Sequence, residues 1–368
     1  MNKIKILALS TSGFAKKEGI STVILDYFSR FNPEEFITEI VIDGNYDKNL
    51  ISEFKNCSIV TQFLPSRKKN TCKYLSAIYM LLKRNKYDAL YIHGSSALMS
   101  MELFIARLCG CKVRIAHSHN TTCDNRHWDR LLRPLFYHLY TDAIACGIQA
   151  GKWLYGNRPF DLMKNGRDIN KYTYDAAKRK NIRNSLHIDE GTLVVGHVGN
   201  FNKQKNQEFL LRVFCELLKK RSNSKLYLMG NGTLLDEQKN LAKKLSIEND
   251  VVFTGNINNV EEMLQAMDVM VLPSLYEGLP LVAIEWQIAS LPCIISDYVT
   301  SECAFSELVC FKSLQDSPDN WADAIIELEG IDRYGIKNIM EKLTISNGFD
   351  INQNALSLQE YFRERCRR

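Results

Sequence analysis

The sequence predicts an α/β protein made of two Rossmann-like, doubly wound domains that face each other across a cleft. Its 368 residues are enough for about two domains, at roughly 100 to 200 residues per domain. Apolar, β-branched segments alternate with segments of helical period, which is typical of parallel sheets. This alternation stops after Asn165 and Gly166 and then begins again, so two such domains are expected.

The first half opens with a strand, a loop and a helix. Residues 4–9 are apolar, the polar loop 11–19 contains Gly13 and Gly19, and apolar residues recur at helical spacing over 20–28. We expect further strands at 37–42, 89–93, 112–117 and 143–146, and helices at 74–82, 97–108 and 131–140.

The second half repeats the pattern after a polar, lysine-rich stretch without apolar periodicity. Strands are expected at 193–198, 225–229, 251–254, 269–272 and 293–296, with helices at 208–220, 234–245, 260–267 and 281–289. The predicted organisation is a first Rossmann-like domain over 1–170, a linker over 171–190, a second Rossmann-like domain over 191–348 and a C-terminal segment over 349–368. In that last segment we expect a helix near 355–365 that packs back across the linker.

Composition excludes several classes of protein. With 45% hydrophobic and 24% charged residues, the chain is neither disordered nor of low complexity. Eleven cysteines without a C-x-x-C pair or an apolar leader favour a reducing cytoplasm. Apolar stretches fall short of the roughly 18 to 20 residues that span a bilayer, so we expect a cytoplasmic protein with at most a peripheral membrane contact.

Charge is unevenly distributed. Residues 1–170 hold 24 Lys and Arg against 15 Asp and Glu (+9), and residues 171–368 hold 23 against 27 (−4). The basic half fits an anionic acceptor, an anionic membrane face or nucleic acid, and a functionally silent surface fits about as well. The basic residues are dispersed and form no recognised nucleic-acid module, so nucleic acid is the least favoured of these.

The most informative segment is P-S-L-Y-E-G-L-P-L-V-A-I-E at residues 273–285, between a strand and a helix. Pro280 suits a first helical turn, and the free amides at a helix start form a diphosphate site, which Gly278 lets a ligand approach. Glu285, one turn into the helix, can accept hydrogen bonds from vicinal hydroxyls such as those of a ribose. Either Glu277 or Glu285 alone fits an ordinary loop or a solvated face, but their spacing after a strand favours function.

Three glycine turns follow strands of the second half. The first, G-N-F-N-K-Q-K-N at 199–206, carries Lys205, which is placed to neutralise phosphate oxygens at a sheet edge. The others are G-N-G, with Gly230, Asn231 and Gly232, and T-G-N-I, which ends at Ile257. One such turn is weak support for a ligand-binding site, because glycine in a turn usually only allows the backbone conformation. Three on one sheet edge outline a nucleotide site.

In the first half, His117 and His119 end a strand in the segment A-H-S-H-N. Side chains two apart on a strand share a face, so the pair has metal-ligand spacing. Zinc needs three or four ligands, however, and no acidic or cysteine partner is apparent nearby. We therefore expect no metal, a structural His117, and a His119 that reaches the cleft.

Taken together, these motifs resemble the retaining glycosyltransferases of family 4, which have two facing Rossmann domains (the GT-B fold), and especially bacterial capsular and exopolysaccharide members. The resemblance extends from the glycine-rich first loop with Gly13 to Ser296 and Asp297, and E-x7-E is its most specific part. It implies transfer of a hexose or N-acetylhexosamine from a nucleotide diphosphate sugar with retention at the anomeric carbon, and no required metal or cofactor.

The resemblance also implies roles for individual residues. Glu285 holds the ribose, while Lys205 and the amides near Leu279, Pro280 and Leu281 hold the diphosphate. Gly230 and Gly232 lie on the nucleotide side, Glu277 binds hydroxyls of the donor sugar, and His119 is the cleft histidine. Catalytic roles therefore fall on Glu277, Lys205 and His119. The remaining expected donor-binding residues are Asn200, Lys203, Asn231, Gly278, Ile257 and Gly13.

The chain departs from the family pattern at four positions. Asn200 stands where an Arg usually shares the diphosphate load, which puts catalytic strength in doubt, and Lys203 is a candidate to replace it. Arg167 replaces a small aliphatic residue, Gly147 a serine, and Ser290 a glycine.

These inferences give one preferred function and two rivals. We expect a UDP-sugar donor and an acceptor glycan on a polyprenyl diphosphate at the membrane face. The first rival is a catalytically weak or silent sugar-nucleotide-binding partner of another glycosyltransferase, suggested by Asn200. The second is a nucleotide-sugar epimerase on the same fold, disfavoured because its acid/base carboxylates have no clear counterpart.

Overall fold

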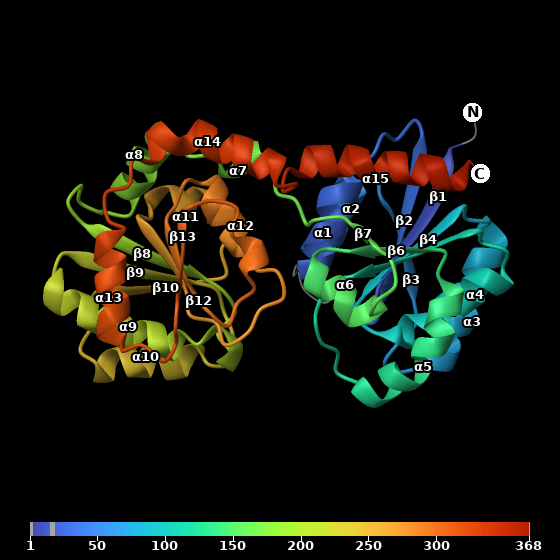
Figure 1. Ribbon diagram of the computed structural model, residues 1–368, viewed down its shortest axis with the longest axis horizontal. Helices are drawn as coiled ribbons and strands as arrows, with labels where there is room; N and C mark the ends of the chain where they lie inside the picture. Colours follow the sequence, from blue (N-terminus) through green and yellow to red (C-terminus); the bar gives the residue numbers. More distant parts are fainter. Residues whose placement is uncertain (1–2, 15–18, 368) are drawn as a thin grey trace. The chain divides into compact units, whose positions relative to one another are not determined.

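The computed structural model describes residues 3–14 and 19–367. The chain divides into unit 1, which comprises Met1–Gly166 and Gly348–Arg368, and unit 2, which comprises Arg167–Asn347. Each unit has its own parallel sheet and its own hydrophobic core. Figure 1 follows the chain through both units by colour.

Unit 1 contains a seven-stranded sheet in the order β3-β2-β1-β4-β5-β6-β7, with every pair parallel. The order reverses between β1 and β4, as in other doubly wound sheets. The strands are β1 (Ile4–Ser10), β2 (Phe36–Asp43), β3 (Val60–Leu64), β4 (Ala89–Gly94), β5 (Val113–Ser118), β6 (Asp142–Ala145) and β7 (Asp161–Leu162). The helices are α1 (Gly19–Phe28), α2 (Lys48–Asn56), α3 (Thr71–Asn85), η1 (Ala97–Met99), α4 (Ser100–Leu108), α5 (Arg126–Leu139), α6 (Ile148–Tyr155) and α15 (Ile351–Cys366).

Unit 2 contains a six-stranded parallel sheet in the order β10-β9-β8-β11-β12-β13, and its order reverses between β8 and β11. The strands are β8 (Leu193–Val198), β9 (Ser224–Met229), β10 (Val251–Gly255), β11 (Val269–Leu272), β12 (Cys293–Ser296) and β13 (Val309–Lys312). The helices are α7 (Ile169–Tyr172), α8 (Ala176–Ser185), η2 (Lys203–Lys205), α9 (Gln207–Lys220), α10 (Leu235–Lys244), α11 (Val260–Ala266), α12 (Leu281–Ile288), η3 (Ser301–Cys303), α13 (Pro318–Glu327) and α14 (Arg333–Ser346).

The expected linker over 171–190 is instead part of unit 2 and contains the end of α7 and all of α8. Apolar periodicity is weak there because polar side chains make the contacts. Arg183 is buried and donates to the carbonyl oxygens of Asp189, Thr192 and Ala266, while Arg179 pairs with Asp268. Hydrogen bonds to carbonyls leave no signal in a hydrophobic pattern.

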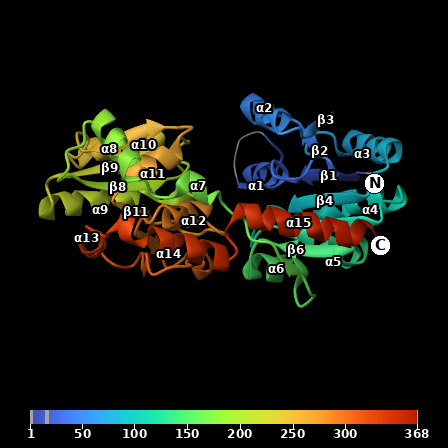
Figure 2. The same cartoon turned by 90° about the horizontal axis from the view of Figure 1, so that it is seen from above.

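The C-terminal helix α15 begins at Ile351, earlier than the sequence predicts, because the Asp350 side chain caps it by accepting from the amide of Asn352. It packs on α1 and β1 of unit 1, where Phe362 contacts Phe31 and Tyr91. Figure 2 shows α15 along the same side of the sheet as α1. The last 21 residues thus complete the first domain's fold.

Candidate active site

The candidate site of unit 2 lies where β8 and β11 end, which is the switch point of its sheet. Ligands of doubly wound proteins bind outside the carboxyl ends of strands at this point. η2, which carries Lys205, follows β8, and the loop that carries Glu277 follows β11. The sheet therefore brings together two segments that lie about 70 residues apart in the sequence.

Lys205 and Glu277 form an ion pair at this switch point. The Lys205 Nζ donates to Glu277 Oε1 at 2.6 Å, and both side chains are mostly buried. Ser274 Oγ donates to the same oxygen at 2.8 Å, and Gln204 Nε2 donates to Oε2 at 3.2 Å. Three donors thus fix the carboxylate, and the lysine ammonium is held with it at the strand ends.

The β8 and β11 loops are also joined through their backbones. The amide of Leu275 donates to the Gln204 carbonyl at 2.8 Å, and the Asn206 side chain donates to the carbonyl of Pro273 at 3.2 Å. Asn206 itself has a φ of 53°, a left-handed conformation that asparagine tolerates. The position of Lys205 is therefore set by the chain on both sides of it.

The glycine turns after β8 and β9 interlock. A Cβ atom on Gly230, whose φ is +145°, would lie 2.2 Å from the carbonyl oxygen of Gly199. A Cβ atom on Gly232 would lie 2.3 Å from the carbonyl oxygen of Phe201. Both glycines are required by close backbone approach, so these turns have a structural reason as well as the proposed ligand-binding one.

Helix α12 begins directly after the Glu277 loop, with Pro280 as its N-cap and no side chain capping its first amides. Gly278 and Leu279 lead into it, and Leu281 is its first residue. Uncapped amides and the positive end of the helix dipole suit an anion. The geometry at this helix start is compatible with the predicted diphosphate position.

Glu285 lies within α12 and is paired with Arg167. The Arg167 Nε donates to Glu285 Oε1 at 2.7 Å, and both side chains are nearly buried. Arg167 is thus the immediate neighbour of the carboxylate predicted to bind ribose. Sequence analysis noted this arginine only as a departure from the family pattern.

The other predicted residues of unit 2 lie on the same sheet edge. Asn200, Lys203, Asn231 and Gly232 are exposed, and Ile257 is half-buried after β10. The Asn200 carbonyl accepts from Gln207 Nε2 at 3.0 Å. In the described loop 199–206 that follows β8, the charged side chains are Lys203 and Lys205, so these two are the candidates to bind a phosphate.

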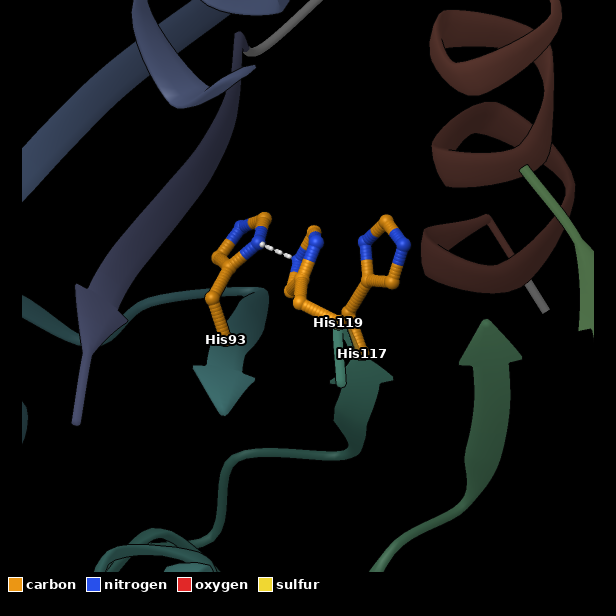
Figure 3. A group of neighbouring side chains, drawn as sticks. All are labelled: His93, His117 and His119. Carbon is orange, nitrogen blue, oxygen red and sulfur yellow. Dashed lines mark hydrogen bonds between the residues drawn. The ribbon is translucent and has the colours of Figure 1, made fainter. Parts of the chain in front are cut away.

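In unit 1, three histidines meet at the carboxyl ends of β4 and β5. His93 Nδ1 and His119 Nε2 share a hydrogen bond of 2.8 Å (Figure 3). His117 Nδ1 is hydrogen-bonded to the Tyr91 hydroxyl at 2.6 Å. His117 is fully buried, and His119 is half-buried with its Nδ1 shielded from solvent. Burial lowers the pKa of His119 to about 3 and holds the pKa values of His93 and His117 well below the usual 6.5. All three are neutral at physiological pH.

His93 is the third histidine that the sequence analysis did not find. It ends the neighbouring strand, and the pairing of β4 with β5 puts it opposite His117. One nitrogen of each ring lies within 4.8 Å of the others, which is compatible with a metal. The hydrogen bond between His93 and His119 already uses one nitrogen of each, and their rings are stacked at 24°. The other nitrogens of the three rings, His93 Nε2, His117 Nε2 and His119 Nδ1, are buried without a hydrogen-bond partner among the described residues.

Gly13 also lies in unit 1, in the turn after β1, with a φ of +75°. The loop that the sequence predicts to follow it includes residues 15–18, which lie outside the described residues. A cavity of about 590 Å³ in unit 1 is found at the opposite edge of the sheet, beside the starts of β4, β5 and β6. It is therefore separate from the candidate site.

Comparison with known proteins finds similarity to glycosyltransferases. Residues 178–333 match the model of glycosyl transferases group 1. The chain is 29% identical to the putative glycosyltransferase EpsF of Bacillus subtilis, with 97% of this chain and 96% of that protein aligned. It is 26% identical to the UDP-Gal:alpha-D-GlcNAc-diphosphoundecaprenol alpha-1,3-galactosyltransferase of Escherichia coli, over 92% and 94% of the two chains.

A solved structure, Anabaena Alr3699/HepE in complex with UDP, superposes with a TM-score of 0.81 at 15% identity, covering 98% of this chain and 100% of that one. At that identity the likeness shows the fold alone. Both units are nevertheless represented in it, as they are in the two relatives. Residues 178–333 thus match the group 1 glycosyltransferases, the whole chain is similar to glycosyltransferases, and its two Rossmann-like domains are of the GT-B type.

Proposed function

We propose that this enzyme transfers a hexose or N-acetylhexosamine from a UDP-sugar, with retention and without a metal, to a polyprenyl-diphosphate-linked glycan of a surface polysaccharide. The observation that carries the proposal is the Lys205–Glu277 pair beside the uncapped start of α12. The UDP donor and the lipid-linked acceptor are suggested by the Escherichia coli relative, whose name includes both. We place the reaction at the cytoplasmic face of the plasma membrane.

The proposed reaction requires positive groups beside the departing diphosphate. Breaking the bond between the anomeric carbon and the diphosphate leaves negative charge on the departing oxygen, which the enzyme must stabilise. In our proposal the Lys205 ammonium and the first amides of α12 supply that stabilisation. Glu277 accepts hydrogen bonds from donor-sugar hydroxyls, and its contacts with Ser274 and Gln204 keep it oriented for this role.

Glu285 completes the donor site in this proposal. Its carboxylate accepts hydrogen bonds from the ribose, and Gly230 and Gly232 allow the nucleotide to approach the backbone. His119, neutral in this environment, can donate or accept a hydrogen bond at the acceptor side. The acceptor hydroxyl oxygen bonds to the anomeric carbon as the bond to the diphosphate breaks, and its proton passes to the departing diphosphate oxygen. No described side chain then has to change its charge.

The test is turnover with UDP-sugars and GDP-sugars, measured as nucleoside diphosphate release with a polyprenyl-diphosphate-linked sugar as acceptor. Lys205→Met and Glu277→Gln should each lower the transfer rate by about 100-fold or more. Lys225→Met is the matched control, because Lys225 also pairs with an acid, Asp250, but at the opposite end of β9. Equal rates for Lys205→Met and the control would refute the assignment.

The silent-binder alternative keeps one observation in its favour, the neutral Asn200 in place of an arginine. It predicts UDP binding by calorimetry without transfer to any acceptor. Turnover by the unmodified chain would exclude it.

A further inference from the structure

We propose that the outer surface of α3, α4 and α5 docks unit 1 on an anionic membrane. These helices are neighbours over one face of the unit 1 sheet, and Figures 1 and 2 show them side by side. Their inner sides pack into a common core through Tyr74, Leu103 and Phe136. We call their opposite, solvent-facing side the α3–α5 surface.

The α3–α5 surface is unusually apolar for an exposed helical face. Trp128, Leu131 and Leu135 follow helical spacing along α5 and are 52%, 60% and 45% exposed. α3 adds Tyr79 and Met80, and α4 adds Phe104 and Leu108. Scattered exposed apolar residues are ordinary, but seven on three adjacent helices indicate a binding surface.

The charges on these helices identify the partner. All residues of the three helices are described, and their two acids, Glu102 and Asp129, are buried in ion pairs with Arg67 and Arg133. The exposed charged residues are Lys73, Lys83, Arg84, Arg107, Arg126 and Arg130. The surface therefore presents cations and apolar side chains together, without an exposed acid.

That combination fits the interface of an anionic bilayer. Apolar side chains, tryptophan above all, enter the boundary between headgroups and acyl chains, while lysine and arginine bind anionic headgroups. A second copy of this chain docked face to face would oppose like charges. Among the described residues no helix is long and apolar enough to cross a bilayer, so contact of this kind would be peripheral.

The surface also lies near the candidate site of unit 1. The loop 120–125 leads from His119 directly into α5, at whose start Trp128 is exposed. Docking through α5 would thus hold the carboxyl ends of β4 and β5 close to the headgroup layer. This consequence depends on the proposed function, in which the acceptor is a lipid-linked glycan, whereas membrane docking itself does not.

The test is sedimentation of the full chain with vesicles of phosphatidylcholine alone or with about one-third phosphatidylglycerol. Binding should need the anionic lipid and should weaken at least tenfold as salt rises, because exposed charges are screened. The triple variant Lys83→Glu, Arg84→Glu, Arg107→Glu should lose about 100-fold in affinity. The matched control reverses Lys239, Lys243 and Lys244, three exposed lysines of α10 in unit 2, and should bind normally.

The apolar part is tested separately. Leu131→Ser should weaken vesicle binding several-fold, whereas Ile339→Ser, at a 54% exposed position on α14 of unit 2, should not. Trp286 and Trp321 are fully buried, and Trp153 is half-buried with its Nε1 bonded to the Ser95 carbonyl, so Trp128 is the most exposed of the four tryptophans. Quenching of tryptophan fluorescence by brominated lipid should therefore be reduced in Trp128→Phe. Quenching that is equal in Trp128→Phe and in the unmodified chain would overturn the proposal. An equal loss of vesicle affinity in the unit 1 triple variant and in the α10 control would also overturn it.

Two further outcomes separate this inference from others. If Leu131→Ser changes the sedimentation mass without vesicles, the surface is an interface between copies and membrane docking is wrong. Soluble UDP binding should be the same in all these variants. Vesicle binding without any glycosyl transfer would contradict the proposed function and leave the docking surface intact.

Discussion

Arg167 donates from Nε to Glu285 Oε1 at 2.7 Å, and the two side chains are only 6% and 10% exposed. The carboxylate predicted to bind ribose is therefore held by an arginine from the start of unit 2. A buried carboxylate is costly unless it is paired, so the arginine both stabilises and orients it.

We expect Glu285→Gln to weaken UDP binding by roughly 10- to 100-fold, since a hydrogen bond to a charged group contributes about 1.5 to 3 kcal/mol. Isothermal titration calorimetry measures this directly. Glu237→Gln, at an exposed position on α10, is the control and should bind UDP normally. Unchanged affinity in Glu285→Gln would refute its assignment to the ribose.

Removing the arginine should be more damaging to stability than removing the charge of its partner. Arg167→Met leaves the Glu285 carboxylate buried without its cation and should lower the free energy of unfolding by about 3 to 5 kcal/mol. In the double variant with Glu285→Gln the loss should be smaller than the sum of the single losses. Additive losses in urea denaturation would show that the pair is not coupled.

Lys203 is predicted to share the diphosphate with Lys205, because Asn200 offers only amide and carbonyl groups where the family has an arginine. Lys203→Ala should then slow transfer about tenfold, which corresponds to about 1.4 kcal/mol. Asn200→Arg should restore much of that rate in the double variant. If neither Lys203→Ala nor Asn200→Arg changes the transfer rate of the unmodified chain, Lys203 does not share the diphosphate with Lys205.

Ser290 is a fully buried residue with a φ of 56°, at a position where the family usually has glycine. Its hydroxyl has no hydrogen-bond partner among the described residues. Ser290→Gly should raise the free energy of unfolding by about 1 kcal/mol, because relief of left-handed strain outweighs the entropy of glycine. Ser246→Gly relieves the same kind of backbone strain, at a φ of 59°, but its side chain is exposed and no buried hydroxyl is removed. Its free energy of unfolding should therefore rise less. Thermal unfolding of the two variants makes the comparison.

The buried histidines should make the protein sensitive to mild acid. Burial lowers the pKa of His197 to about 4, and His93, His117 and His119 are also depressed. Between about pH 6.5 and 4 the unfolded chain binds protons that the native state does not, so stability must fall as pH falls. Each such histidine contributes up to about 1.4 kcal/mol per pH unit.

Urea denaturation at several pH values tests this. The free energy of unfolding should decrease from pH 7 to pH 5, and His197→Gln should reduce the slope. A flat profile across that range would mean that the histidines are not held neutral.

The strands and glycine turns of unit 2 could be predicted because their determinants are local. The predicted strands 193–198, 269–272 and 293–296 coincide with β8, β11 and β12. In each case a short apolar segment ends at polar or turn-forming residues, and both signals lie within the segment itself. The order in which the strands lie side by side then places Lys205 and Glu277 at one sheet edge.

Contacts between distant residues could not be predicted in the same way. Arg167 and Glu285 are 118 residues apart, and nothing in either local sequence indicates the other. His93 was overlooked because its role depends on the pairing of β4 with β5. Helix α8 was missed because arginine hydrogen bonds to carbonyl oxygens, rather than an apolar stripe, hold it in unit 2.

The return of the chain to unit 1 has a genetic consequence. A Cβ atom on Gly166 would lie 2.6 Å from the backbone nitrogen of Ile351, so the outgoing and returning segments are pressed together where unit 1 is interrupted. Unit 2 is one continuous segment of the chain, Arg167–Asn347, which could be exchanged as a cassette between these two positions. A crossover that exchanged only the gene's beginning would instead pair a foreign β1 and α1 with the original α15, and their mismatched core would select against it.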